Sequence, residues 1–145
     1  MNILDRPDVW REFSANSPAN RQAIDKFESD SHFKLPKDYE QFLERMNGGE
    51  GFVGEAYLSL WRVEELLQRN KDYEVDEYTP GFFIFGSDGG GESFGFDLRS
   101  DLKEVVCIPF IGSGWEDAVR IASTFTEFLE VVSKSWPGVL FHPQG

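Results

Sequence analysis

The segment Gly81–Leu98, GFFIFGSDGGGESFGFDL, constrains the fold of this 145-residue chain more than any other stretch. Its apolar run Phe82–Phe85 stops at Gly86, and after a turn with three consecutive glycines the apolar residues alternate with small or polar ones. Glycine supplies the positive φ values that a tight reversal needs, so we expect two strands joined by a turn. The continuous run predicts a first strand buried on both faces, and the alternation predicts a half-buried second strand.

The turn between these strands lacks the residues of two common ligand-binding loops. It has no Lys and no GK[ST] sequence, so it does not match a phosphate-binding P-loop. Its carboxylates, Asp88 and Glu92, do not have the ligand spacing of a helix-flanked calcium loop. Two interpretations remain: the pair binds a cation, or Asp88 supports its own turn through side chain-to-backbone hydrogen bonds.

Apolar periodicity elsewhere predicts helices at both ends of the chain and strands mostly in the middle. Ser17-Pro18 is typical of a helix start, and that helix should end near Ser31. Residues 36–46 carry an apolar stripe at helical spacing, and the capping-box pair Thr124 and Glu127 marks the start of a last helix. The remaining predicted elements are strands at 58–60, 105–111 and 118–121, a short helix around 63–67, and an acidic surface loop at 70–80.

This order of elements predicts an α+β fold with a largely antiparallel central sheet and helices packed mainly on one face. The length favours a single domain over residues 1–145. Several apolar positions of the predicted elements should meet in one core. They are Leu35, Phe42, Phe85, Phe96, Phe125 and Leu129.

The composition narrows the classes of partner. The formal net charge is −12 and the estimated isoelectric point about 4.5. Such a surface repels nucleic acid and anionic membrane and favours a basic partner through long-range attraction; the alternative is that the charge only keeps the protein soluble. The first residues do not resemble a secretory signal, and no apolar stretch has membrane-spanning length, so we expect a cytoplasmic protein.

The sequence gives little support for catalysis or metal binding. Cys107 is the only cysteine, so neither an intramolecular disulfide nor a CxxC zinc motif is available. His32 and His142 lack the Glu-x-x-His and His-x-His spacings of common metal sites. We therefore expect no catalytic residue, no metal and no cofactor.

Four segments in this order resemble the SUKH superfamily: LPKDYEQFLERMNGGEG, LSLWRVEEL, FFIFGSDGGGESFGFDL and ASTFTEFLE. The similarity covers about residues 24–129. The superfamily includes a fungal cell-wall-assembly regulator and many bacterial immunity proteins that neutralise polymorphic toxins. The resemblance implies an α+β fold and a protein-binding role, commonly the inhibition of a toxin by direct contact. It implies no particular contact residues, because the toxin-binding surfaces differ among members.

Candidate partner-binding residues are therefore chosen by charge and aromatic character. Trp115 lies in a glycine-rich turn beside two acids, and Trp is enriched at binding hot spots. The alternative is that its ring folds back over the edge of the sheet. Tyr73 and Tyr78 combine aromatic and acidic character in a similar way. The predicted set is Trp115, Glu116, Asp117, Asp88, Glu92, Tyr73, Glu74, Asp76 and Glu77.

Three hypotheses for the function follow. The first is an immunity protein that neutralises a toxin encoded by a neighbouring gene, for example a basic nuclease, by stoichiometric occlusion. The second is an intracellular regulatory scaffold without a toxin partner. The third is a small enzyme or metal-binding protein. A toxin gene beside this gene would separate the first two, whereas turnover lost on mutation of Asp88, Glu92 or a histidine would favour the third. The sequence does not predict the oligomeric state.

Overall fold

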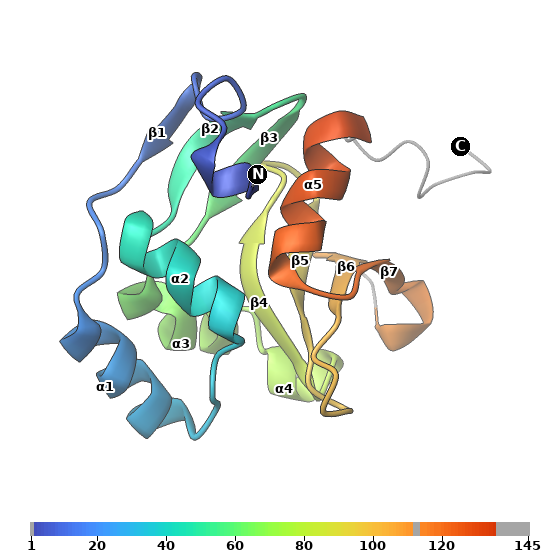
Figure 1. Cartoon of the computed structure of the whole chain (residues 1–145). Coiled ribbons are helices and arrows are strands. Elements are labelled where there is room, and N and C mark those ends of the chain that lie inside the picture. Colours follow the sequence, from blue (N-terminus) through green and yellow to red (C-terminus); the bar gives the residue numbers. More distant parts are fainter. Residues whose placement is uncertain (1, 112–113, 136–145) are drawn as a thin grey trace.

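The fold is built on one seven-stranded sheet, seen in a computed structural model that describes residues 2–111 and 114–135 (Figure 1). The strands follow one another in sequence order, and every neighbouring pair is antiparallel. They are β1 (Phe13–Ala15), β2 (Gly49–Val53), β3 (Ala56–Leu60), β4 (Phe82–Ser87), β5 (Glu92–Asp97), β6 (Val105–Pro109) and β7 (Val119–Ala122). The helices are η1 (Ile3–Asp5), α1 (Arg21–Ser31), α2 (Lys37–Arg45), α3 (Val63–Asp72), α4 (Val75–Tyr78), η2 (Trp115–Asp117) and α5 (Phe125–Ser135). The predicted α+β class, with an antiparallel sheet and helices toward both ends, is confirmed.

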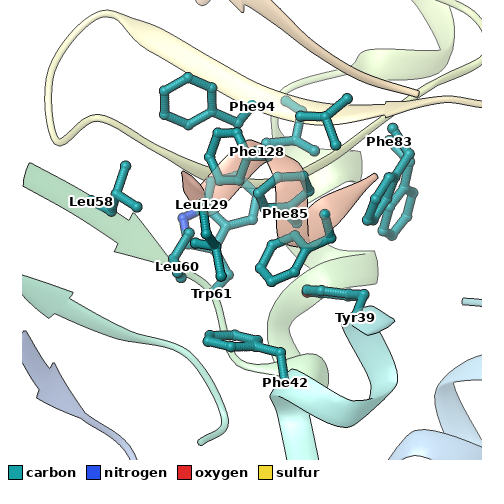
Figure 2. Close-up of a cluster of buried hydrophobic side chains, with 14 of the residues drawn as sticks. Tyr39, Phe42, Leu58, Leu60, Trp61, Phe83, Phe85, Phe94, Phe128 and Leu129 are labelled. Carbon is teal, nitrogen blue, oxygen red and sulfur yellow. The ribbon is translucent and has the colours of Figure 1, made fainter. Parts of the chain in front are cut away.

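The core lies between one face of the sheet and the helices α2 and α5; in Figure 1, α5 lies in front of the strands and α2 lies to the left of β4. Figure 2 shows Tyr39 and Phe42 of α2 pointing toward Phe85 of β4, with Phe128 of α5 beside it. Phe125 joins this cluster, with its ring centroid 4.9 Å from that of Tyr39 and 5.2 Å from that of Phe85. All six residues that the sequence predicts for the core are buried there. We call this side of the sheet the helix face.

The predicted hairpin β4–β5 is confirmed, but the prediction that its second strand is half-buried is wrong. All of β4 is buried, as predicted, and so are the four central residues of β5. The other face of β5 is covered because the ring of Phe82 lies over Gly95, where an added Cβ would come within 2.6 Å of the ring. In the turn, the Oδ1 atom of Asp88 accepts the N–H groups of Gly90 at 2.9 Å and Glu92 at 3.2 Å. Asp88 therefore supports its own turn.

Two helix starts differ in detail from the expected caps. Helix α1 begins at Arg21 because Asn20, not Ser17, is the capping residue: its Oδ1 atom accepts the Ala23 N–H at 2.8 Å. In α5 the Thr124 Oγ1 atom accepts the Glu127 N–H at 3.0 Å, as the capping box predicts. The returning bond comes from Ser123, one residue earlier than expected, whose N–H donates to Glu127 Oε1 at 2.6 Å.

The predicted acidic surface loop at 70–80 is wrong, because this segment ends α3 and forms α4 against the sheet. Strands β3 and β4 pair only at Ser59–Leu60, with Ser87 and Gly86, so the pairing with β3 ends before Ile84. The side chain of Asn70 takes that place: its Oδ1 atom accepts the Ile84 N–H at 2.8 Å, and its Nδ2 atom donates to Ile84 O at 2.9 Å. With Val75 also buried, the corner between α3 and α4 is fixed to β4.

Candidate protein-binding site

A cavity of about 450 Å³ lies between α4 and the sheet face opposite the helix face. Its floor is largely apolar and consists of Val75, Phe82, Ile84, Ile108 and Pro109, together with the hydroxyl side chains of Thr79 and Ser93. Three aromatic side chains line its walls: Tyr73, Tyr78 and Phe110. The volume falls within the range of about 300–1,000 Å³ that is usual for binding pockets. We call this space the α4 cavity.

The two tyrosines of the α4 cavity differ in how firmly they are held. Tyr73 stacks between Phe110, at 4.6 Å between ring centroids, and Trp61, at 6.0 Å. Tyr73 nevertheless remains 45% exposed to solvent. Tyr78 is 61% exposed and forms no ring contact with any residue in the described ranges. Tyr78 is thus an aromatic group presented to solvent beside an apolar cavity.

Acidic side chains gather at the same corner. Glu74, Asp76 and Glu77 are exposed, and none of them pairs with a basic residue in the part of the chain that the structure describes. All three line a second groove of about 520 Å³ on the far side of α4. The structure therefore places Tyr73 and these three predicted carboxylates around one short helix, where attraction for a positively charged partner would concentrate.

The other aromatic candidate, Trp115, is engaged within the chain. Its Nε1–H donates to Pro80 O at 2.8 Å, and its ring meets that of Phe82 at 5.8 Å between centroids. The guanidinium of Arg99 lies 3.4 Å from the centroid of the Trp115 ring. Two bonds of 3.0 Å from Arg99 to Asp97 hold the pKa of that carboxyl below its ordinary value. Trp115 folds back over the sheet, which is the second of the two interpretations, while its neighbours Glu116 and Asp117 remain exposed.

Glu92 does not belong to the α4 corner, because it alternates with Phe94 and lies on the helix face of β5. Its Oε1 atom accepts the S–H of Cys107 at 3.2 Å. Burial first, and this hydrogen bond second, raise the pKa of the Cys107 thiol. Cys107 is thus a neutral, buried thiol rather than a nucleophile.

The reactivity of Cys107 provides a direct test of this environment. We expect a thiol reagent such as DTNB to modify the folded protein roughly 100-fold more slowly than the urea-unfolded chain, because the native thiol is buried and protonated. The measurement is the absorbance of the released thiolate over time. Rapid modification under native conditions would contradict the burial of this side chain.

The remaining candidates for metal or acid–base chemistry do not converge. His32 is an exposed residue at the end of α1, and His142 lies outside the described residues. Within 2–111 and 114–135, no three His, Cys, Asp or Glu side chains come together as ligands for a metal ion. The helices of this same part of the chain include none with the length and apolar character needed to cross a membrane.

Sequence reasoning missed an exposed aromatic pair on the open face of β2 and β3. Phe52 and Tyr57 meet edge to face at 5.5 Å between centroids. The Tyr57 ring also packs on Gly89 of the β4–β5 turn, where an added Cβ would lie 2.8 Å from it. The alternation along β3 provides a signal for this, because Tyr57 and Ser59 fall opposite the buried residues Leu58 and Leu60.

Comparison with known proteins gives the family of this fold. The model of the SMI1/KNR4 family (SUKH-1) matches residues 18–131. The chain belongs to this family. The match includes every element from α1 to β7 and most of α5, so the resemblance to the SUKH superfamily is confirmed over most of the chain. The chain is also 27% identical over 122 residues to the uncharacterized protein YnaB of Bacillus subtilis (strain 168), an alignment that covers 83% of this chain and 80% of that protein.

Proposed function

We propose that this SUKH-1 protein is an immunity protein that binds a toxin encoded by a neighbouring gene and blocks it by occupying its surface. The observation that carries the proposal is the corner around α4, where the exposed Tyr78 borders an apolar cavity and three acids border the groove on the other side of the helix. Aromatic anchors beside pockets supply much of the affinity of protein interfaces, and complementary charge speeds their formation. Family membership supports a protein-binding role without naming the partner.

The proposed mechanism is stoichiometric and non-catalytic. A basic toxin domain, such as a nuclease, is attracted by the acidic surface, and the carboxylates of α4 take the place of the phosphates that such a surface ordinarily meets. The aromatic contacts then slow dissociation of the complex. A nuclease would act on nucleic acid in the cytoplasm, so we also propose a cytoplasmic location for this protein.

The test is neutralisation of the neighbour-encoded toxin domain by the purified protein. We expect activity to fall linearly with added protein and to vanish at one equivalent. The association rate should fall as salt shortens the Debye length from about 30 Å at 0.01 M to about 8 Å at 0.15 M. Full toxin activity with excess protein would refute the immunity role, and a salt-independent association rate would refute its electrostatic part.

A regulatory scaffold without a toxin partner is the second candidate. It is favoured by the exposed pair Phe52 and Tyr57, which lies on a different element from α4 and would allow a second protein to bind at the same time. The genes beside this one distinguish the two roles. An immunity protein requires a neighbouring toxin gene, whereas a scaffold requires none.

A further inference from the structure

We propose that the α4 cavity receives an apolar side chain, preferably an aromatic one, from a positively charged segment of the partner. Lysines or arginines that flank this side chain would lie against Tyr78 and be attracted by Asp76 and Glu77 on the far side of α4. The inference rests on the proposed function and deepens it, because it names the chemistry of the segment that the partner must present at this site.

The floor of the α4 cavity suits an apolar group because its polar side chains already have partners. The Ser93 hydroxyl donates to Ile108 O at 2.6 Å, and the Thr79 hydroxyl donates to Val75 O at 3.3 Å. The rest of the floor is aliphatic or aromatic. An apolar side chain can therefore displace water from the floor without leaving a buried hydroxyl unpaired, which would be costly. A charged side chain would lose its hydration on this floor, and the two hydroxyl groups, which already donate within the chain, could offer it only acceptor oxygens.

The carboxylates of α4 favour positive charge in the residues that flank the inserted side chain. Asp76 and Glu77 are exposed on the same short helix, where they line the second groove on its far side, and neither has a basic partner among the described residues. The faces of the Tyr78 ring are not covered by another ring in the same part of the chain, so a cation can lie on one of them. An acidic segment would be repelled by these carboxylates and by the net charge of −12.

The cavity is also held open before any partner arrives. On one side, the hydrogen bonds of Asn70 fix the end of α3 to Ile84. On the other side, the Trp115 indole fixes the end of the α4 segment through its bond to Pro80 O. Because both ends of the wall are anchored, little conformational entropy remains to be lost when a side chain enters.

The first experiment uses two short peptides as probes, acetyl-KKWKK-amide and acetyl-KKGKK-amide, titrated into ¹⁵N-labelled protein. We expect the tryptophan peptide to shift the amide signals of Tyr73, Val75, Tyr78 and Ile108 in a saturable manner. The glycine peptide should bind roughly tenfold more weakly, because it lacks the group that fills the cavity. Tyr78→Ala should remove most of this difference between the two peptides. Equal binding of the peptides, or saturable shifts centred elsewhere, would overturn the proposal.

A pair of double variants separates the local charge from the overall charge. Asp76→Lys/Glu77→Lys and Glu116→Lys/Asp117→Lys change the net charge by the same amount at two exposed sites. The first double variant should bind the tryptophan peptide roughly tenfold more weakly than wild type, and the second only about twofold more weakly. Screening by salt confines most of the attraction to nearby charges. Equal losses would mean that the peptide responds only to the net charge, and would overturn the role of α4. Unchanged spectra outside the altered site show that each variant is folded.

The same variants distinguish a failure of the inference from a failure of the proposed function. If the toxin domain is neutralised equally well by wild type and by Tyr78→Ala/Asp76→Lys/Glu77→Lys, the immunity role stands and the α4 inference is wrong. If the tryptophan peptide binds at α4 but the toxin domain is not neutralised, the chemistry of the cavity stands and the immunity role is wrong.

Discussion

Replacing Phe125 by alanine is expected to lower the free energy of unfolding by about 3–5 kcal/mol, the usual cost of removing a large aromatic side chain from a packed core. Phe125 is 1% exposed, and its ring lies within 5.8 Å, between centroids, of Tyr39, Phe42, Phe85 and Phe128. The cavity left behind would face two helices and the central strand at once. A loss of this size would consume much of the stability of a domain of this length.

The matched control is Phe52→Ala, the same chemical change at a residue that is 44% exposed. We expect this variant to lie within about 1 kcal/mol of wild type, as most surface substitutions do. The measurement is urea unfolding followed by far-ultraviolet circular dichroism. If Phe125→Ala were no more destabilising than Phe52→Ala, the packing of α5 on the sheet would be contradicted.

The core was predictable because its residues follow simple periods. In α2, Tyr39, Phe42 and Leu43 recur at helical spacing, and in β4 the apolar run extends across the whole buried strand. These patterns depend only on the local element and on which side of it is buried. The long-range arrangement then follows, because antiparallel strands with short connections neighbour one another in sequence order.

The strands β1 and β2 were not predicted, because their sequences carry little apolar alternation. Gly48 and Gly49 follow α2 and are typical of residues that end a helix. However, Gly49 and Gly51, both with positive φ, belong to β2 and pair with Ala15 and Phe13 of β1. A Cβ on Gly51 would come within 2.3 Å of Glu12 O. Glycine is therefore required here by the close approach of a neighbouring strand, and that contact is long-range information.

The candidate site was predicted where its residues are adjacent in sequence. Residues 73–77 are close in any conformation, so charge and aromatic content were sufficient to group them. Placing Glu92 and Trp115 required information beyond local charge and aromatic content. The parity of Glu92 with Phe94 and Phe96 would have placed it on the helix face, a signal available in the sequence. The bond from Trp115 to Pro80 joins residues 35 positions apart, and no local pattern predicts it.

Asn70 also lay in the segment interpreted as a loop, and its replacement is expected to be strongly destabilising. It is 8% exposed, and its amide pairs with both backbone groups of Ile84 in the manner of an additional strand residue. Its Nδ2 atom also donates to Leu66 O at 2.8 Å within α3. Replacing Asn70 by leucine would leave the Ile84 N–H and C=O buried without these partners. Since each such group costs about 1–3 kcal/mol, we expect a total loss of about 2–4 kcal/mol.

Two further variants separate this hydrogen bonding from the general effect of a substitution in α3. Gln68→Leu changes an exposed amide on the same helix, which donates to Asp72 Oδ1 at 2.9 Å, and it should cost less than about 1 kcal/mol. Asn70→Asp keeps the acceptor for the Ile84 N–H but sets a carboxylate against Ile84 O. That contact and burial should raise the pKa of the new carboxyl above its ordinary value of about 4, because they disfavour its charged form. The folded state then favours the protonated form, so the destabilisation relative to wild type should grow as the pH rises from about 5 to 8. Urea unfolding at several pH values measures this difference, and hydrogen exchange at the Ile84 amide reports the local bond. Equal stabilities of Asn70→Leu and Gln68→Leu, with the Ile84 amide still protected, would show that β4 does not depend on this side chain.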